Sequence, residues 1–202
     1  IAEVARELEE AIASANGAGG DGARTEPRSN IPAPVTSFVG REREIVSVRA
    51  LLSATRLLTL CGAGGLGKTR LSLQVAADVV TAYPDGVWFV ELASLTEERQ
   101  VWPAVASVVG VKEEAGRPVI EALVRFVKDR TVLLILDNCE HLVRACAELV
   151  SRLLQSGSQL TILASSREAL HVRGETAYQV PALALPDPER RIPLEALLRY
   201  EA

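Results

Sequence analysis

At 202 residues the chain is long enough for one domain with a well-buried core and some additional tail. Its 48% hydrophobic and 24% charged residues are typical of a globular protein, and no apolar run approaches the ~20 residues that a membrane helix needs. The 22 basic and 26 acidic residues leave a net charge of −4 without a stripe of Lys and Arg, so this segment lacks the electrostatic footprint of nucleic-acid binding.

Two segments precede the predicted core. Residues 1–14 have the spacing of an amphipathic helix, which we expect to be the end of an upstream domain; a solvated terminal helix is the alternative. Residues 15–34 are rich in Gly, Ala, Ser and Pro and cannot bury enough apolar surface to order themselves, so we expect a flexible linker. Because the chain begins at Ile1 and contains no Met, we expect it to be a piece of a longer protein.

The core is expected to span residues 35–190, and its most informative stretch runs from Gly62 to Thr69. This stretch matches the phosphate-binding pattern G-x-x-x-x-G-K-[ST] without a mismatch, between a short apolar strand and a segment with helical apolar spacing. The glycines let backbone N–H groups turn inward around phosphate oxygens, and the helix N-terminus adds the positive end of its dipole. Lys68 can reach the β- and γ-phosphates, and the Thr69 hydroxyl can ligate Mg²⁺. The alternative is a glycine-rich turn that matches by chance.

We therefore predict a nucleoside triphosphate site. The residues expected around the phosphates are Gly62, Gly64, Gly65, Leu66, Gly67, Lys68, Thr69 and Arg70.

Strands and helices alternate through the rest of the core. The predicted strands are 87–92, 131–136, 159–164 and, more weakly, 176–180. The predicted helices are 96–109, 117–129 and 140–155. Continuous apolar strands that alternate with helices predict an α/β fold, an open parallel sheet with helices on both faces.

Asp137 supplies the oxygen ligand that a bound Mg²⁺ would need. It follows an apolar strand directly, and in open α/β sheets ligands bind at the carboxyl ends of the strands. The alternative role is to cap the helix expected near Glu140. Arg167 follows the next strand, where an arginine can form charge-assisted bonds to a γ-phosphate; an exposed surface arginine is the alternative.

The cysteines indicate the compartment. Cys61, Cys139 and Cys146 are an odd number and lie inside predicted apolar elements, which argues against a disulfide framework and for a reducing environment. We expect a cytoplasmic protein.

The order of motifs resembles that of STAND-class P-loop ATPases, relatives of the NB-ARC switches. Residues 38–44 read Phe-Val-Gly-Arg-Glu-Arg-Glu and match the hhGRExE motif that precedes the P-loop in that class. The wider sequence is similar to the ATPase core of large bacterial transcription regulators of the SARP and LuxR-like types, over roughly residues 30–202. The other similar stretches are 31–37, 85–92, 136–142, 165–168 and 180–186.

The resemblance implies a nucleotide switch. In such proteins ADP favours a closed resting form and ATP an open form that self-associates, and helical, winged-helix and sensor domains follow the nucleotide-binding domain. Residues 191–202 resemble only the start of the helical part. The implied partners are ATP or ADP, further copies of the full-length protein in its ATP form, and DNA only through other domains.

The resemblance also implies roles for individual residues. Phe38, Val39 and Arg41 would lie at the adenine and ribose side of the site. Lys68 and Thr69 would hold phosphates and Mg²⁺. Two further residues complete the set: Asp137 would be the Walker B acid and Arg167 the γ-phosphate sensor.

One position departs from a common pattern. Many ATPases of this division carry a second acid directly after the Walker B Asp, to polarise the attacking water, and this chain has Asn138 there with Glu140 two residues on. An amide can orient water but cannot accept its proton, so general-base help is weak unless Glu140 supplies it. We therefore expect slow ATP hydrolysis.

Two other functions stay open from the sequence. A small P-loop kinase or other phosphotransferase would need an acceptor pocket and an arginine-rich lid; the hhGRExE motif and the lack of a clustered Arg lid argue against it. A nucleotide-stabilised scaffold without turnover is compatible with Asn138.

Overall fold

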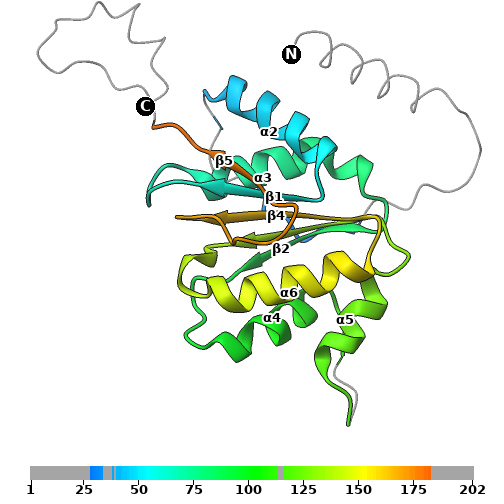
Figure 1. Cartoon of the computed structure of the whole chain (residues 1–202). Coiled ribbons are helices and arrows are strands. Elements are labelled where there is room, and N and C mark those ends of the chain that lie inside the picture. The colour runs from blue at the N-terminus through cyan, green and yellow to red at the C-terminus, as the bar shows by residue number, and fades with distance from the viewer. Residues whose placement is uncertain (1–27, 34–37, 39, 113–115, 183–202) are drawn as a thin grey trace, which may run out of the picture.

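The computed structural model describes residues 28–33, 38, 40–112 and 116–182 (Figure 1). These residues form a five-stranded sheet in the order β2-β3-β4-β1-β5, in which every pair of neighbours is parallel. The strands are β1 (Leu57–Cys61), β2 (Gly86–Glu91), β3 (Val132–Asp137), β4 (Leu160–Ser166) and β5 (Thr176–Gln179). The predicted open parallel sheet is confirmed. The helix expected over 1–14 and the segment 191–202 lie outside the described residues.

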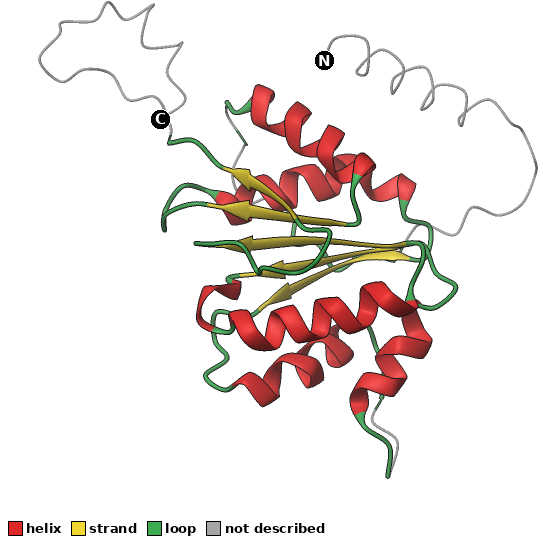
Figure 2. Cartoon of the chain, in the orientation of Figure 1, coloured by secondary structure: helices red, strands yellow, loops and turns green. Residues whose placement is uncertain are grey.

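Helices cover both faces of the sheet, as predicted (Figures 1 and 2). One face carries α2 (Glu42–Ala54) and α3 (Lys68–Val79); the other carries α4 (Val101–Val108), α5 (Val119–Val127) and α6 (Val143–Ser156). Three short 3₁₀ turns are η1 (Val80–Ala82), η2 (Glu98–Gln100) and η3 (Cys139–His141). None of the helices in the described part of the chain is both long and apolar enough to cross a bilayer.

The helix predicted over 96–109 is shorter in the structure. Glu97 and Gln100 form a capping box that starts the 3₁₀ turn η2, and α4 begins only at Val101. Pro103 lies in the first turn of α4, where its missing N–H costs no hydrogen bond, so the helix starts just before it. Helix α2, which directly follows Arg41, was not among the predicted helices.

Two apolar cores lie on opposite faces of the sheet. Leu134 and Leu136 pack with α4, α5 and α6, whereas Leu133 and Ile135 point to the other face and pack with α2 and α3. All of β3 is buried, as the continuous apolar run predicted. The alternation of side chains along β3 therefore joins both cores through one strand.

A short strap, residues 28–33, lies along the outer edge of β2. The Val87 N–H donates to the Arg28 carbonyl (2.9 Å), and Ser29 forms a parallel bridge with Val87. The Asn30 amide pairs with the backbone of Phe89: its Nδ2 donates to the Phe89 carbonyl (2.8 Å) and its Oδ1 accepts the Phe89 N–H (2.7 Å). These residues fall within the segment expected to be a linker. Hydrogen bonds to a strand edge hold them in place, and composition alone does not reveal such bonds.

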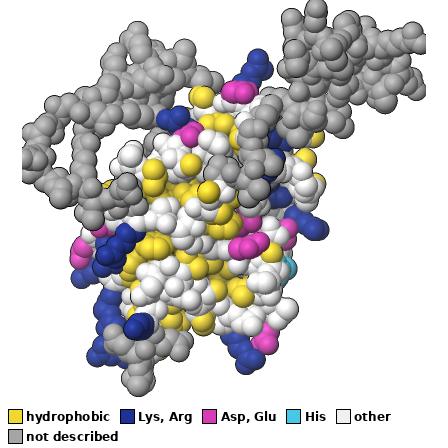
Figure 3. Space-filling model, turned by 180° about the vertical axis from the view of Figure 1, so that it is seen from behind, with side chains coloured by type: hydrophobic (Ala, Val, Ile, Leu, Met, Phe, Trp, Pro, Cys, Tyr) yellow, Lys and Arg dark blue, Asp and Glu magenta, His cyan; other side chains and the backbone are white. Residues whose placement is uncertain are grey.

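Charged side chains are dispersed over the face of the described residues that Figure 3 shows. On the face shown in Figure 3, Lys and Arg side chains lie at separate places around the rim, with Asp and Glu between them and apolar side chains toward the middle.

Candidate nucleotide-binding site

The glycine loop connects the end of β1 to the start of α3. Gly67 precedes α3 with φ 77°, and Gly62 leaves β1 with φ 149°. The φ of Gly62 is one that side-chain-bearing residues rarely adopt, and a Cβ there would also lie 2.8 Å from Leu66 Cδ1, so glycine suits this position. The first turn of α3, with N–H groups that have no partner within the helix, is thereby aimed at the carboxyl edge of the sheet, an arrangement suited to an anion.

Lys68 is folded into this loop. Its Nζ donates to the carbonyls of Gly62 (2.8 Å) and Ala63 (2.9 Å), and only 8% of the residue is exposed. Both acceptors are neutral, and an ammonium group bonds more strongly to charged oxygens such as those of phosphate. The ammonium group therefore lies within the loop and has stronger potential partners than those it now contacts.

Thr69 and Asp137 meet across the sheet edge. The Thr69 hydroxyl lies 2.9 Å from each carboxylate oxygen of Asp137, and Asp137 is 3% exposed. Mg²⁺ prefers hard oxygen ligands and commonly takes one or two from protein, with water and phosphate supplying the rest. A carboxylate beside a hydroxyl fits that requirement, so these two residues could hold Mg²⁺.

Ser165 is the residue of this site that the sequence did not single out. Its Oγ donates to Asp137 Oδ1 (2.5 Å) and accepts the Asn138 N–H (3.0 Å). The Asp137 carboxylate thus accepts hydrogen bonds from hydroxyl groups on two elements, β4 and α3. Of the described hydrogen bonds, none joins the Asp137 side chain to the N–H groups of η3, so nothing in the described structure supports the capping alternative.

Arg167 and Glu140, whose roles were inferred separately, form an ion pair with each other. Arg167 Nε lies 3.3 Å from Glu140 Oε1, and the two side chains are 69% and 17% exposed. The second carboxylate oxygen, Glu140 Oε2, is buried and has no hydrogen-bond partner among the described residues. Asn138, between Asp137 and this pair, has φ 63° in the left-handed region.

Two of the residues expected near the adenine, Phe38 and Arg41, are among the described residues. Arg41 is 4% exposed and donates to the carbonyls of Leu66 (2.8 Å) and Pro181 (3.1 Å), which ties the glycine loop to the segment after β5. Phe38 is half-buried, and the Arg70 guanidinium lies 5.7 Å from the centre of its ring. Val39 lies outside the described residues. The structure brings Arg41 and Phe38 close to the loop, and their role toward adenine stays a prediction.

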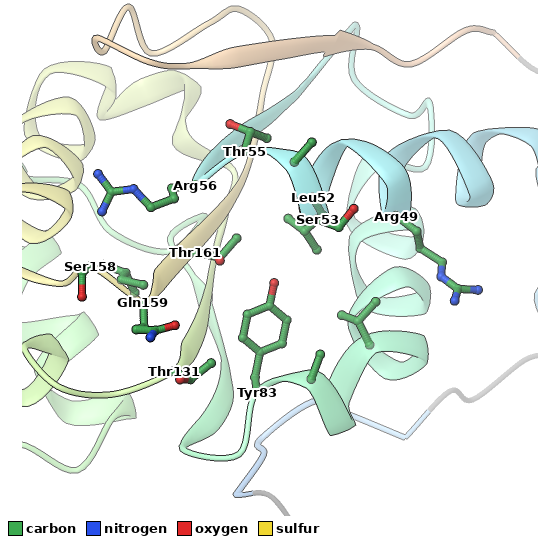
Figure 4. A pocket seen from close by; sticks show the side chains of 14 residues that line it. Arg49, Leu52, Ser53, Thr55, Arg56, Tyr83, Thr131, Ser158, Gln159 and Thr161 are labelled. Carbon is green, nitrogen blue, oxygen red and sulfur yellow. The ribbon is translucent and has the colours of Figure 1, made fainter. Parts of the chain in front are cut away.

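A different hollow opens at the opposite, amino edge of the sheet (Figure 4). Its volume is about 420 Å³, and the Tyr83 ring points into it, toward Thr161. Burial raises the pKa of Tyr83. Arg56 also lines the hollow, and its Nη1 donates to the carbonyls of Leu154 (3.0 Å) and Gly157 (2.9 Å) at the end of α6. Because ligands of open α/β sheets bind at the carboxyl ends of the strands, this hollow is not the candidate site.

Sequence comparisons find relatives that are named as regulators. A protein of Mycobacterium tuberculosis whose name describes it as a candidate HTH-type transcriptional regulator is 46% identical over 140 residues, which cover 69% of this chain and 16% of the relative. The regulatory protein AfsR of Streptomyces coelicolor is 33% identical over 128 residues, 54% of this chain and 13% of the relative. The chain thus spans a small part of the length of these relatives.

Solved structures share the fold at low sequence identity. The Pyrococcus horikoshii signal transduction ATPase with numerous domains, which has a tetratricopeptide repeat sensor, matches with a TM-score of 0.50 at 16% identity, over 80% of this chain and 25% of that one. Cdc6p of Pyrobaculum aerophilum matches with a TM-score of 0.54 at 14% identity, over 74% of this chain and 47% of that one. The model of the AAA domain family matches residues 50–172, from within α2 to beyond β4. The chain belongs to the AAA domain family of P-loop ATPases.

Proposed function

We propose that this chain is the ATP- and ADP-binding switch module of a STAND-type, NB-ARC-like signalling ATPase that regulates transcription, with slow Mg²⁺-dependent hydrolysis. The observation that carries the proposal is the convergence of Lys68, Thr69 and Asp137 at the carboxyl edge of the sheet, behind a complete glycine loop. The hhGRExE motif at residues 38–44 supports the finer assignment to the STAND class.

In this proposal the loop binds the phosphates. Lys68 gives up the carbonyls of Gly62 and Ala63 for β- and γ-phosphate oxygens, because charge-assisted bonds are the stronger ones. Thr69 and Asp137 hold Mg²⁺, which when bound neutralises part of the phosphate charge.

Arg167 is the proposed sensor of the γ-phosphate. Its ion pair with Glu140 is largely exposed on the arginine side, and exposed pairs contribute roughly 0–1 kcal/mol. A γ-phosphate carries more negative charge than a carboxylate and matches the planar fork of donors on a guanidinium, so within reach it competes with Glu140 for Arg167. The same exchange frees Glu140, which can then accept a proton from the attacking water.

Hydrolysis in this proposal is slow. Asn138 stands where a second acid is common, and its amide can orient water but not deprotonate it. The exposed Arg167 side chain also indicates a site open to water, in which electrostatic stabilisation is weak. We expect turnover well below the ~1–100 s⁻¹ typical of kinases.

Regulation of transcription would require the rest of a longer protein. Relatives named as regulators support this context, and DNA contact would come through other domains. In this proposal the nucleotide-binding domain spans residues 35–190. The linker at residues 15–34 joins it to an upstream domain, and a helical domain follows the nucleotide-binding domain from residue 191. Self-association in the ATP form and a cytoplasmic location belong to the same proposal.

Two measurements test the proposal. The nucleotide retained by the purified chain should be ADP, identified by chromatography after denaturation. Single-turnover hydrolysis of Mg²⁺-ATP should be slow, and Glu140→Gln should slow it further. Turnover at tens per second would refute the switch, and a phosphorylated small molecule as product would favour the phosphotransferase alternative. Binding with no measurable phosphate release would favour the scaffold.

A further inference from the structure

Ser165 occupies a special place in the sheet. It lies at the end of β4, which runs between the glycine-loop strand β1 and the Asp137 strand β3. In the ladder Ser165 stands opposite Leu60 of β1, and its neighbour Ala164 stands opposite Leu136 of β3. The residue therefore lies on the strand between those that lead to the glycine loop and to Asp137, and it is only 1% exposed.

One oxygen of Ser165 connects two successive residues of the site. Its hydroxyl donates to Asp137 Oδ1 (2.5 Å) and accepts the backbone N–H of Asn138 (3.0 Å). A serine hydroxyl has one proton to donate and lone pairs that accept, so it can make both bonds at once. The two bonds fix the direction of the carboxylate and the position of the next residue together.

The bond to Asn138 stabilises a conformation that is otherwise unfavourable. Asn138 has φ 63°, a region that side-chain-bearing residues avoid and asparagine tolerates better than most. A buried polar group without a partner is costly, so losing the Ser165 hydroxyl would loosen this turn as well as the carboxylate. The proposed metal ligand and the backbone of Asn138 therefore depend on the same hydroxyl.

We propose that Ser165 is a positioning residue for the metal shell: it orients the Asp137 carboxylate for Mg²⁺ and fixes the backbone of the next residue, Asn138, through its N–H. This inference rests on the proposed function, because it names what aligns the Asp137 carboxylate in that same site.

The alternative is that Ser165 only stabilises the fold, and Ser166 provides the matched control. Ser166 is the next residue of β4 and is fully buried, and its hydroxyl accepts the Glu168 N–H at 3.4 Å. None of the hydrogen bonds among the described residues joins it to Asp137. Removal of its hydroxyl should affect packing in a similar strand position but leave the carboxylate untouched.

The experiment measures ATP affinity by calorimetry as a function of Mg²⁺ concentration, and ADP affinity without metal. Ser165→Ala should raise the Mg²⁺ concentration needed for half-maximal binding about five- to tenfold, which corresponds to about 1–1.4 kcal/mol, the net contribution of one hydrogen bond that orients the ligand without touching the metal. Ser165→Thr keeps the hydroxyl and should stay close to the natural chain, and Ser166→Ala should do the same. ADP affinity without metal should be unchanged in all three variants.

A thermal unfolding scan checks that each variant is folded. If Ser165→Ala does not fold, Ser165→Cys replaces it in the test, because a thiol is similar in shape to a hydroxyl but donates only weakly. An unchanged Mg²⁺ requirement in the Ala or Cys variant overturns the proposal, and so does an equal loss of metal-free ADP binding. If the natural chain binds Mg²⁺-ATP and these results appear, the positioning role alone fails. If the natural chain does not bind Mg²⁺-ATP at all, the proposed function fails and this inference with it.

Discussion

The two edges of the sheet each hold a basic side chain bonded to two backbone carbonyls, and the bonds have nearly equal lengths. At the carboxyl edge Lys68 donates to Gly62 and Ala63 at 2.8 and 2.9 Å; at the amino edge Arg56 donates to Leu154 and Gly157 at 3.0 and 2.9 Å. Hydrogen bonding alone therefore does not distinguish a binding residue from a structural one.

The acceptors make the difference. Leu154 and Gly157 lie at the end of α6, whose last carbonyls have no partner within the helix, so Arg56 satisfies groups that need a donor and complements the helix dipole. The carbonyls of Gly62 and Ala63 belong to a loop with positive φ angles, beside a buried carboxylate. Arg56 stabilises a helix end, whereas Lys68 is held in a loop shaped for an anion.

Substituting each cation tests this contrast and carries the largest expected effect. Lys68→Ala should weaken ATP binding about ten- to a hundredfold, since a charge-assisted bond worth roughly 1.5–3 kcal/mol is lost. Arg56→Ala should leave ATP affinity unchanged and lower the free energy of unfolding by about 1 kcal/mol. Titration calorimetry and urea unfolding measure the two effects. Equal ATP affinities in the Lys68 variant and the natural chain would remove Lys68 from the site and break the comparison.

Asp137→Asn asks whether the carboxyl edge holds a metal. The amide is nearly isosteric and still accepts hydrogen bonds from Thr69 and Ser165, but it lacks the charge that favours Mg²⁺. We expect the Mg²⁺ dependence of ATP binding to fall and turnover to be lost, with metal-free ADP binding nearly intact. Calorimetry with and without Mg²⁺ measures this. Equal loss of metal-free ADP binding would assign Asp137 a structural role, like that of Arg56.

Arg167→Ala should have a smaller effect, confined to the distinction between two nucleotides. The proposed contact is to the γ-phosphate alone, so the variant should lose more affinity for ATP than for ADP. The ratio of the two affinities should therefore fall. Competition binding of both nucleotides to the variant and the natural chain measures the ratio. A parallel drop for ATP and ADP would contradict a sensor and leave Arg167 as the partner of Glu140 only.

The smallest expected effect concerns pH, and both edges contribute to it. Burial raises the pKa of Cys61, at the end of β1, and of Tyr83, at the amino edge. The folded state retains these protons when the unfolded state has already released them, so stability should fall as pH rises above about 8.5 for the thiol and about 10 for the phenol.

Urea midpoints measured from about pH 8 to about pH 11 should show this decline. Tyr83→Phe should flatten its upper part without changing ATP affinity near neutral pH. A decline of identical steepness in the Phe variant would show that Tyr83 does not contribute.

Local patterns were enough for much of the fold. The apolar run from 131 to 136 predicted β3 because a strand buried on both faces has no polar alternation to obscure it. The strand order was not predictable, because the position of β4 between β1 and β3 depends on how the crossovers pack. The prediction of a helix over 96–109 followed the apolar spacing alone. It did not take into account that Glu97 caps a 3₁₀ turn and that Pro103 favours the first turn of a helix, so the start of α4 at Val101 was missed.

The same limit applies to the candidate site. Lys68 and Thr69 lie in one contiguous pattern, and Asp137 ends a recognisable strand, so each could be named from the sequence. Ser165 and the Arg167–Glu140 pair depend on which strand lies beside which, and that information is tertiary. A polar residue at the end of a buried strand was the available signal for Ser165, but it did not indicate a partner.

The pairing of Asn30 with the backbone of Phe89 has a consequence for association between molecules. An unpaired strand edge is a template on which other chains can add, and edge strands left open promote aggregation. Residues 28–30 occupy the hydrogen-bonding groups of β2 at Val87 and Phe89. Removal of the strap, by starting the chain after residue 33, would uncover that edge of β2 and favour the addition of strands from other molecules. A recombinant form of this domain therefore needs the strap to remain monodisperse.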